Sequence, residues 1–200
     1  MEPNRFSRRS VLALGAGVIV ATATPLQAAS GAQAEALVGK LVDDINDVIA
    51  SGMSEAQMIA RFEQIFIRYA DVPTIARYAL GRDSRAASAA QMKRFTNEFT
   101  AYLARKYGKQ FRKFIGGKIE MQGSRAVKSY FEVATMAKLK GEAPFEVQFL
   151  VTDRSGELLF FNMFIEGINM LLAERSEIGA LLDRNGGNID AMIKDLAKIA

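Results

Sequence analysis

The sequence predicts an α+β fold in which helices cover one face of a curved antiparallel sheet of four strands. Apolar residues recur at helical spacing over about residues 34–114 and again after residue 168. Between these regions, residues 118–165 alternate as strands do and have short connections, which favours an antiparallel meander. The chain has 200 residues, half of them apolar, which is enough for one domain with a substantial core.

Four helices are expected before the sheet. Residues 34–50 carry an apolar face and are followed by Gly52, a typical helix terminator. Ser54 and Ser88 are each followed by Gln three residues later, and these capping boxes start the second helix and a long fourth helix that reaches about residue 114. Asp71 caps a short third helix between them.

The strands are expected over residues 118–124, 128–139, 144–153 and 157–165. The last of these is apolar on both faces except for Asn162, so we expect it to lie centrally in the sheet. Two further helices follow. They cover about residues 168–184 and the segment from Asn188 to the C-terminus.

The first residues are predicted to be an export signal. Arg5, Arg8 and Arg9 precede an uncharged apolar run that ends near Ala23, and small residues follow it. Residues 7–12, Ser-Arg-Arg-Ser-Val-Leu, are similar to a twin-arginine signal. An uncleaved membrane anchor is the alternative, but the run is shorter than the ~20 residues that a spanning helix needs.

We therefore expect a twin-arginine-like signal peptide over residues 1–29 and a periplasmic domain over residues 30–200. Cleavage is expected after Ala28 or Ala29, with a second candidate site at residues 32–34. Removing residues 1–28 takes away three Arg and one Glu, so the formal net charge of +4 becomes +2.

Three residue types are missing altogether, because the chain has no His, no Cys and no Trp. Their absence excludes acid–base catalysis by histidine, cysteine nucleophiles, disulfides and zinc sites with nitrogen or sulfur ligands. A metal would need oxygen ligands alone, and the sequence indicates no such site. Most familiar enzyme mechanisms are therefore excluded.

Large apolar side chains are abundant, with 13 Phe, 5 Tyr and 9 Met. They concentrate in the apolar stripes of the helices and on the inward faces of the strands. Such residues line cavities for long apolar ligands because they adapt to ligands of varying length. They also fill ordinary cores, and composition alone favours that second interpretation.

A basic segment runs from Arg105 to Lys118, with six positive charges and no acid. In a cytoplasmic protein this pattern would suggest nucleic acid, but for an exported protein we expect no nucleic-acid partner. Anionic lipid head groups or an acidic partner surface are better candidates. A solvated helix face that compensates the helix dipole is an equally good explanation.

Several segments together carry a resemblance to a known family. They are residues 71–82 (Asp-Val-Pro-Thr-Ile-Ala-Arg-Tyr-Ala-Leu-Gly-Arg), 88–91 (Ser-Ala-Ala-Gln), 166–171 (Glu-Gly-Ile-Asn-Met-Leu) with Arg175, and Gly186-Gly187. In wording, order and spacing they resemble the MlaC, or toluene-tolerance, family of periplasmic phospholipid-binding carriers in the pathway that maintains lipid asymmetry. Ser84 departs from the family, which usually has Trp there.

The resemblance implies a cone of the NTF2-like type whose hydrophobic cavity holds acyl chains between sheet and helices. It implies no catalysis and no cofactor other than phospholipid cargo. The expected partners are an inner-membrane ABC transporter complex with a lipid-transfer (MCE-type) domain and an outer-membrane lipoprotein–porin complex. With the apolar periodicity, it selects as lipid-binding residues Phe62, Phe66, Tyr69, Phe99, Leu103, Val133, Phe145, Val147, Phe149, Phe161, Met163 and Ile168.

Arg77, Arg82 and Arg85 cluster around the third helix. They are candidates for contact with a lipid head group or with a partner protein. Ion pairs within the domain are an equally good explanation.

Two rival functions stay open. One is an enzyme of the same shape, whose acid–base work would fall to residues such as Glu132, Glu146, Glu166 and Tyr130. Their spacing forms no convincing pair, and a carboxyl with a raised pKa in a cavity would favour this function. The other is an exported interaction or adaptor domain whose core is filled and carries no lipid.

Overall fold

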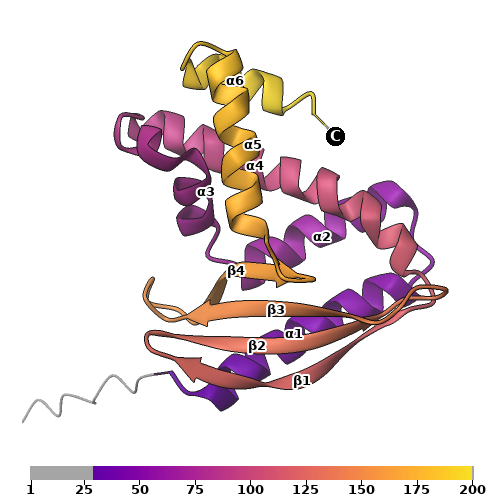
Figure 1. Ribbon diagram of the computed structural model, residues 1–200. Helices are drawn as coiled ribbons and strands as arrows, with labels where there is room; N and C mark the ends of the chain where they lie inside the picture. The colour runs from indigo at the N-terminus through magenta and orange to yellow at the C-terminus, as the bar shows by residue number, and fades with distance from the viewer. Residues whose placement is uncertain (1–28, 200) are drawn as a thin grey trace, which may run out of the picture.

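The computed structural model describes residues 29–199, which form six α-helices, two 3₁₀ helices and one five-stranded sheet (Figure 1). The predicted signal peptide lies, except for Ala29, outside the described residues. In chain order the elements are α1 (Gly31–Ala50), α2 (Glu55–Tyr69), α3 (Val72–Leu80), η1 (Gly81–Arg85), α4 (Ala89–Gly108), η2 (Lys109–Phe114), β1 (Lys118–Val127), β2 (Tyr130–Lys138), β3 (Phe145–Thr152), β4 (Leu159–Ile165), β5 (Ile168–Asn169), α5 (Met170–Arg184) and α6 (Ile189–Leu196).

The predicted helix starts are confirmed at Ser54, Asp71 and Ser88, where each side chain accepts a hydrogen bond from a backbone N–H of the first turn. A capping box at Ser30 starts α1 slightly before the predicted residue 34. The expected long helix to residue 114 is α-helical to Gly108 and continues as η2. None of the helices in residues 29–199 has the length and hydrophobicity needed to cross a membrane.

The sheet is an antiparallel meander in the order β1-β2-β3-β4-β5. The prediction of four strands was wrong by one, because Ile168 and Asn169 form the short strand β5 beside the end of β4. Glu166 and Gly167 make this possible, since positive φ angles of 51° and 76° turn the chain back on itself there. Two residues are too few for alternation to be visible in the sequence.

The expectation that the fourth strand lies centrally was also wrong. β4 pairs along its length with β3, but its other edge pairs only with the two residues of β5. Helices cover it instead: α5 packs against β4, and the backbone N–H of Asp71 donates to the carbonyl oxygen of Phe160 at 2.8 Å. An apolar strand can therefore lie near the edge of a sheet when helices bury it.

A β-bulge interrupts the pairing of β3 with β4. Leu150 pairs with Asn162 and Val151 pairs with Phe160, so Phe161 is the extra residue. As a result Phe160 faces the helices and is 2 % exposed, with its ring centroid 5.8 Å from that of Phe66. A second irregularity lies between Met121 and Gly123 in β1.

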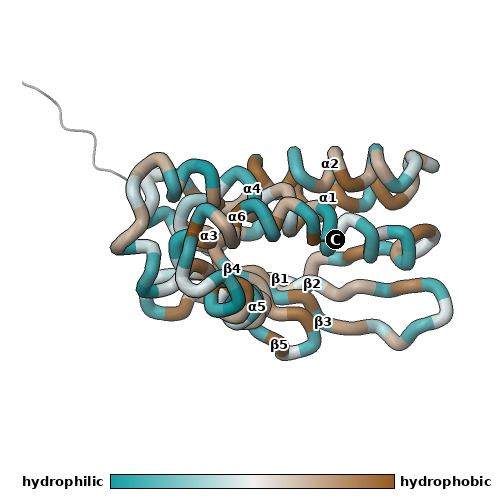
Figure 2. Tube along the Cα trace, turned by 90° about the horizontal axis from the view of Figure 1, so that it is seen from above, coloured by the Kyte–Doolittle hydropathy of each residue, from teal (hydrophilic) through white to brown (hydrophobic). Residues whose placement is uncertain are grey.

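The helices lie on one face of the sheet and beyond its β4 edge (Figures 1 and 2). α1 runs along β1 and is joined to it by Asn46, whose amide donates to the carbonyl of Ile119 and accepts from its N–H, both at 3.0 Å. α2 and α4 pack closely together at Gly108, which has no side chain. A Cβ there would lie only 2.8 Å from Cγ1 of Ile59 in α2. The core lies between these helices and the sheet.

Candidate functional site

A cavity of about 140 Å³ lies between the sheet and the helices and is partly open to solvent. Its wall is almost wholly apolar, because the inward faces of α1, α2, α4, β3 and β4 meet there. The lining residues are Leu41, Ile45, Phe62, Ile65, Phe66, Ile75, Leu103, Tyr107, Gln110, Phe114, Ile119, Val147, Phe149, Phe160, Phe161, Asn162, Met163, Ile165, Met170, Leu171 and Glu174.

The opening of the cavity can be placed from the exposure of its lining. Gln110 in η2 is exposed, and Tyr107 at the end of α4 and Phe114 in η2 are partly exposed. Met163 in β4 and Met170 at the start of α5 are also partly exposed. The cavity therefore opens between the end of α4 with η2 on one side and β4 with the start of α5 on the other.

Seven of the twelve residues that the sequence nominated for lipid binding line this cavity. They come from the stripe of α2, from α4, from the inward face of β3 and from β4. These seven are Phe62, Phe66, Leu103, Val147, Phe149, Phe161 and Met163.

Four other nominated residues contribute to the core and not to the cavity wall. Tyr69 is 7 % exposed and its hydroxyl donates to Asp44 at 2.9 Å, while burial raises its pKa above the usual value. Phe99 and Val133 are fully buried. Phe145 packs edge-on against Phe114, with ring centroids 6.3 Å apart.

Ile168 lies on the surface, so the prediction that it lines the interior needs correction. Its side chain is 60 % exposed because it lies opposite Ile165, which does line the cavity, in the two-residue strand β5 at the edge of the sheet. The prediction had placed this residue at the inward start of a helix. The short strand β5 replaces that turn of helix.

Some lining residues were missed by the sequence analysis. Phe160 was missed because simple alternation along β4 turns it away from the helices, and only the bulge brings it inward. Phe114 and Tyr107 belonged to a recognised apolar stripe and could have been nominated. Glu174 gave no signal, because a buried glutamate in a helix looks like an exposed one.

Asn162 explains the single polar position of β4. It is 8 % exposed, and its side-chain oxygen accepts hydrogen bonds from the N–H groups of Met163, at 2.8 Å, and Leu171, at 3.1 Å. Its amide nitrogen donates, at 3.0 Å, to the side-chain oxygen of Asn169. The same oxygen of Asn169 caps the start of α5. This amide therefore fixes the start of α5 against β4 at the cavity wall.

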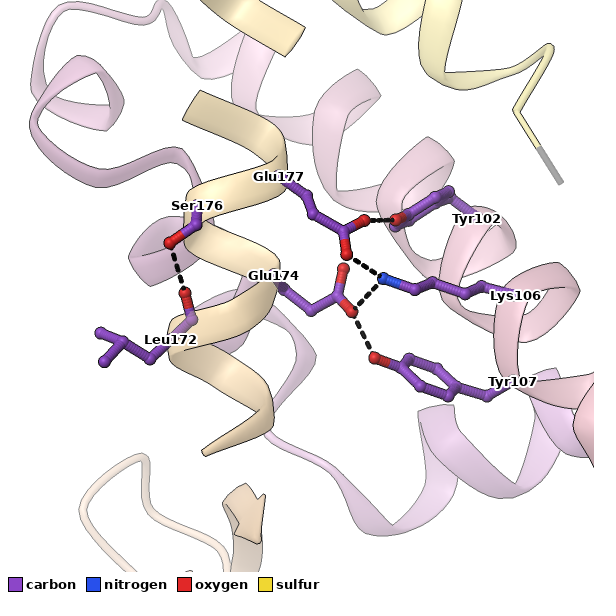
Figure 3. A network of polar contacts seen from close by, with 7 residues as sticks. All are labelled: Tyr102, Lys106, Tyr107, Leu172, Glu174, Ser176 and Glu177. Carbon is purple, nitrogen blue, oxygen red and sulfur yellow. Dashed lines mark hydrogen bonds and ion pairs between the residues drawn. The ribbon is translucent and has the colours of Figure 1, made fainter. Parts of the chain in front are cut away.

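A polar cluster closes the gap between α4 and α5 (Figure 3). Lys106 donates to Oε1 of Glu174 at 2.8 Å and to Oε1 of Glu177 at 2.7 Å. Tyr107 donates to the same oxygen of Glu174, and Tyr102 donates to Oε2 of Glu177 at 2.7 Å. Glu174 is 3 % exposed and reaches the cavity, so the cluster joins the cavity wall to the surface.

The pKa values in this cluster follow from burial and from the hydrogen bonds. Burial raises the pKa of Glu177, but hydrogen bonds from Lys106 and Tyr102 outweigh it and hold that pKa below the usual value. Burial lowers the pKa of Lys106, but the two glutamates outweigh it and raise that pKa. Burial, with the neighbouring carboxylates, raises the pKa of Tyr102 and Tyr107.

The three arginines that the sequence singled out lie outside the cavity wall. Arg77, Arg82 and Arg85 are exposed on α3 and η1. Arg82 makes one loose ion pair, with its Nε 3.9 Å from Asp83. Because they are exposed, they are candidates for contact with a partner. They do not line the cavity, so they would not contact a ligand inside it.

The residues that an enzyme would have used do not meet at the cavity. Glu132 pairs with Arg125, whereas Glu146 and Glu166 are exposed. The ring of Tyr130 packs edge-on against Phe161. Residues 29–199 hold no group of three or more acidic side chains placed to bind a metal ion.

The fold and the cavity define an α+β domain that encloses an apolar space. The sequence matches the family model described as MlaC protein over residues 35–198, and the chain therefore belongs to the MlaC family. A solved structure with a similar fold is that of a phospholipid-binding protein from Ralstonia solanacearum in complex with a phospholipid, with a TM-score of 0.71 and 19 % identity over 82 % of this chain and 95 % of that one. None of the curated proteins compared with the chain matches it.

We predict that Glu177 stabilises the fold in a pH-dependent way. Its folded-state pKa is lowered from 4.5, so its contribution is present above that value and is lost as the pH falls through the folded-state pKa. Urea unfolding at about pH 7 and about pH 3.5 should therefore show Glu177→Gln as more destabilising at the higher pH, by less than about 1 kcal/mol because the carboxylate is half-exposed.

The matched control for this prediction is Asp183→Asn on the exposed side of the same helix. It should behave like the unmodified protein at both pH values. A difference between Glu177→Gln and the unmodified protein that is independent of pH would contradict the assignment.

Proposed function

We propose that the protein is a phospholipid-binding carrier and that the cavity holds the acyl chains. The observation that supports this most strongly is the cavity wall, which is apolar except at Tyr107, Gln110, Asn162 and Glu174. An ordinary filled core would leave no such space. The family membership and the phospholipid-binding protein of similar fold support the same ligand class.

The size of the cavity indicates how loading must proceed. An apolar cavity of about 150 Å³ holds a molecule the size of benzene, so about 140 Å³ accommodates only part of an acyl chain. The side chains on the two sides of the opening must therefore move apart when lipid enters. Phe and Met side chains, which form much of the wall, tolerate such rearrangement.

The energetics suit a carrier that releases lipid only at its destination. Burial stabilises a methylene by ~0.8 kcal/mol, so one chain of about 15 carbons gains roughly 12 kcal/mol. Spontaneous release into water is then negligible, and the lipid must pass directly to another apolar environment. Because binding acts through the tails, we expect weak discrimination among head groups.

The remaining parts of the proposal concern the cellular setting. We place the carrier in the periplasm, shuttling phospholipid between an inner-membrane ABC transporter complex with an MCE-type domain and an outer-membrane lipoprotein–porin complex. The predicted export signal and the family membership support this setting. We also propose that the sheet and helices form the cone of the NTF2-like type that the family resemblance implies. We propose further that the protein catalyses no reaction.

Extraction of a fluorescent phospholipid from vesicles tests the carrier function. Val147→Asp places a carboxylate in the cavity wall and should reduce extraction at least about tenfold, because an unpaired charge is costly there. Val147→Phe, which fills the space with an apolar ring, should also reduce it. The matched control is Gln148→Asp on the opposite face of β3, which should extract lipid normally.

Circular dichroism shows which of these variants are folded before extraction is compared. Equal extraction by the folded Val147→Phe variant and the unmodified protein would contradict the placement of the tails. Failure of the unmodified protein to extract any lipid would contradict the carrier function itself.

Export is tested by N-terminal sequencing of the protein recovered from the periplasmic fraction. We expect a chain that begins at Ala29 or Ser30, because small residues precede both positions. Lys in place of both Arg8 and Arg9 should block export if the twin-arginine route is used. Recovery of the uncleaved chain in the cytoplasmic fraction would contradict the proposed location.

A further inference from the structure

A basic surface lies beside the opening of the cavity, and we call it the basic rim. It comprises residues 109–118 (η2 and the start of β1) and residues 138–144 (the end of β2 and the turn after it). These two segments contain six Lys or Arg residues and one acid, Glu142. They are adjacent in space, since Lys118 is opposite Lys138 in the sheet and a Cβ at Gly116 would lie 4.0 Å from Cδ of Lys140.

Only part of this charge is compensated by neighbouring acids. Arg112 pairs with Glu55 at 3.2 Å, and Glu120 is shared by Lys138 and Lys118. Within residues 29–199, the exposed Lys109, Lys113 and Lys140 form no ion pair. The rim and the acids beside it carry six positive and three negative charges. The positive charges are on Lys109, Arg112, Lys113, Lys118, Lys138 and Lys140, and the negative charges are on Glu55, Glu120 and Glu142.

The net charge of this group is +3, whereas the whole chain after residue 28 has a net charge of +2. The remaining residues together carry a net charge of −1, so the group at the basic rim accounts for the net positive charge of the domain. Such an asymmetry orients a protein at a negatively charged surface.

An exposed isoleucine lies in the middle of the basic rim. Ile115 is 50 % exposed and directly follows Phe114, whose side chain lines the cavity. Gln110, in the same short helix, also lines the cavity. The segment that carries the exposed cations and the exposed Ile115 is therefore the same one that forms a side of the cavity opening.

We propose that the basic rim docks on the surface of a bilayer that contains anionic lipids. Lys109, Lys113 and Lys140 contact the head groups and Ile115 inserts between them, as cations and aliphatic residues do at membrane interfaces. This orientation turns the cavity opening toward the bilayer, so acyl chains move between bilayer and cavity without crossing water. The inference rests on the proposed carrier function and adds the surface through which lipid is exchanged.

The chemistry of the rim favours a lipid surface over a folded partner. Its three unpaired cations are all lysines, which are compact hydrated charges on flexible stems. They contact a disordered field of phosphates readily and lack the planar fork that gives arginine its paired geometry. A single exposed aliphatic residue among them suits shallow insertion.

Vesicle co-sedimentation tests the docking surface. The protein is expressed from the full chain and mixed with vesicles of phosphatidylglycerol and phosphatidylcholine, or of phosphatidylcholine alone. We expect binding only to the anionic vesicles, and its loss as salt rises to about 1 M, where the Debye length is ~3 Å. The Lys109→Gln/Lys113→Gln double variant should bind about 25-fold more weakly, since each lysine near an anionic surface contributes about fivefold.

Two control variants match these changes at a distance from the rim. Lys93→Gln removes an exposed lysine from the far end of α4, about 24 Å along the helix from Lys109, and should bind vesicles normally. Ile115→Asn should weaken binding, whereas Ile67→Asn, at an equally exposed position of α2, should leave it unchanged. Equal binding to neutral and anionic vesicles, or normal binding by the double variant, would overturn the proposal.

The same samples separate this inference from the carrier function. Lipid extracted from the purified protein reports carriage, and sedimentation reports docking. Protein that carries phospholipid but does not bind anionic vesicles overturns the docking surface alone and would point to an acidic partner protein. Protein that carries no lipid overturns the carrier function whatever its affinity for vesicles.

Discussion

The helices and the sheet are held together at Phe160, and the cavity depends on that junction. The bulge at Phe161 turns the ring of Phe160 toward the helices, where it meets Phe66 and Phe149 with centroids 5.8 and 5.5 Å away. The carbonyl of Phe160 also accepts from Asp71 at the start of α3. Side-chain packing and a backbone hydrogen bond thus fix the helical layer at one end of the cavity.

The two sides of the opening are held in a different way. α5 is positioned by the buried amide of Asn162 at its start and by the cluster of Lys106, Glu174 and Glu177 in its middle. These contacts are polar, and two of the residues that make them, Asn162 and Glu174, are buried. Aromatic packing therefore joins the helices to the sheet at Phe160, whereas hydrogen bonds and ion pairs position α5 beside the opening.

The sequence was sufficient for most of the fold, because its signals are local. Helix starts at Ser54, Asp71 and Ser88 depend on residues within one turn, and β1 to β4 were recognised from alternation and short connections. The additional strand β5 was not predictable in this way, since it depends on the backbone turn at Glu166. The position of β4 near the edge depends on which helices cover it.

The candidate site was predicted only in part, for reasons that are physical. Stripe periodicity identified Phe62, Phe66 and Phe149 but could not separate residues that line a cavity from residues such as Phe99 that fill the core. A bulge changes the facing of every residue beyond it, which is why Phe160 was missed. The buried Glu174 depends on partners in another helix, so no local pattern could reveal it.

The most direct test of the account is native mass spectrometry of the protein, expressed from the full chain and purified without detergent, with identification of any released ligand. The account predicts a mass excess equal to that of a phospholipid, which is released when the protein is denatured. A mass equal to that of the polypeptide alone, both as purified and after incubation with phospholipid vesicles, would contradict it. The cavity would then carry no lipid, and an exported interaction domain would be the better description.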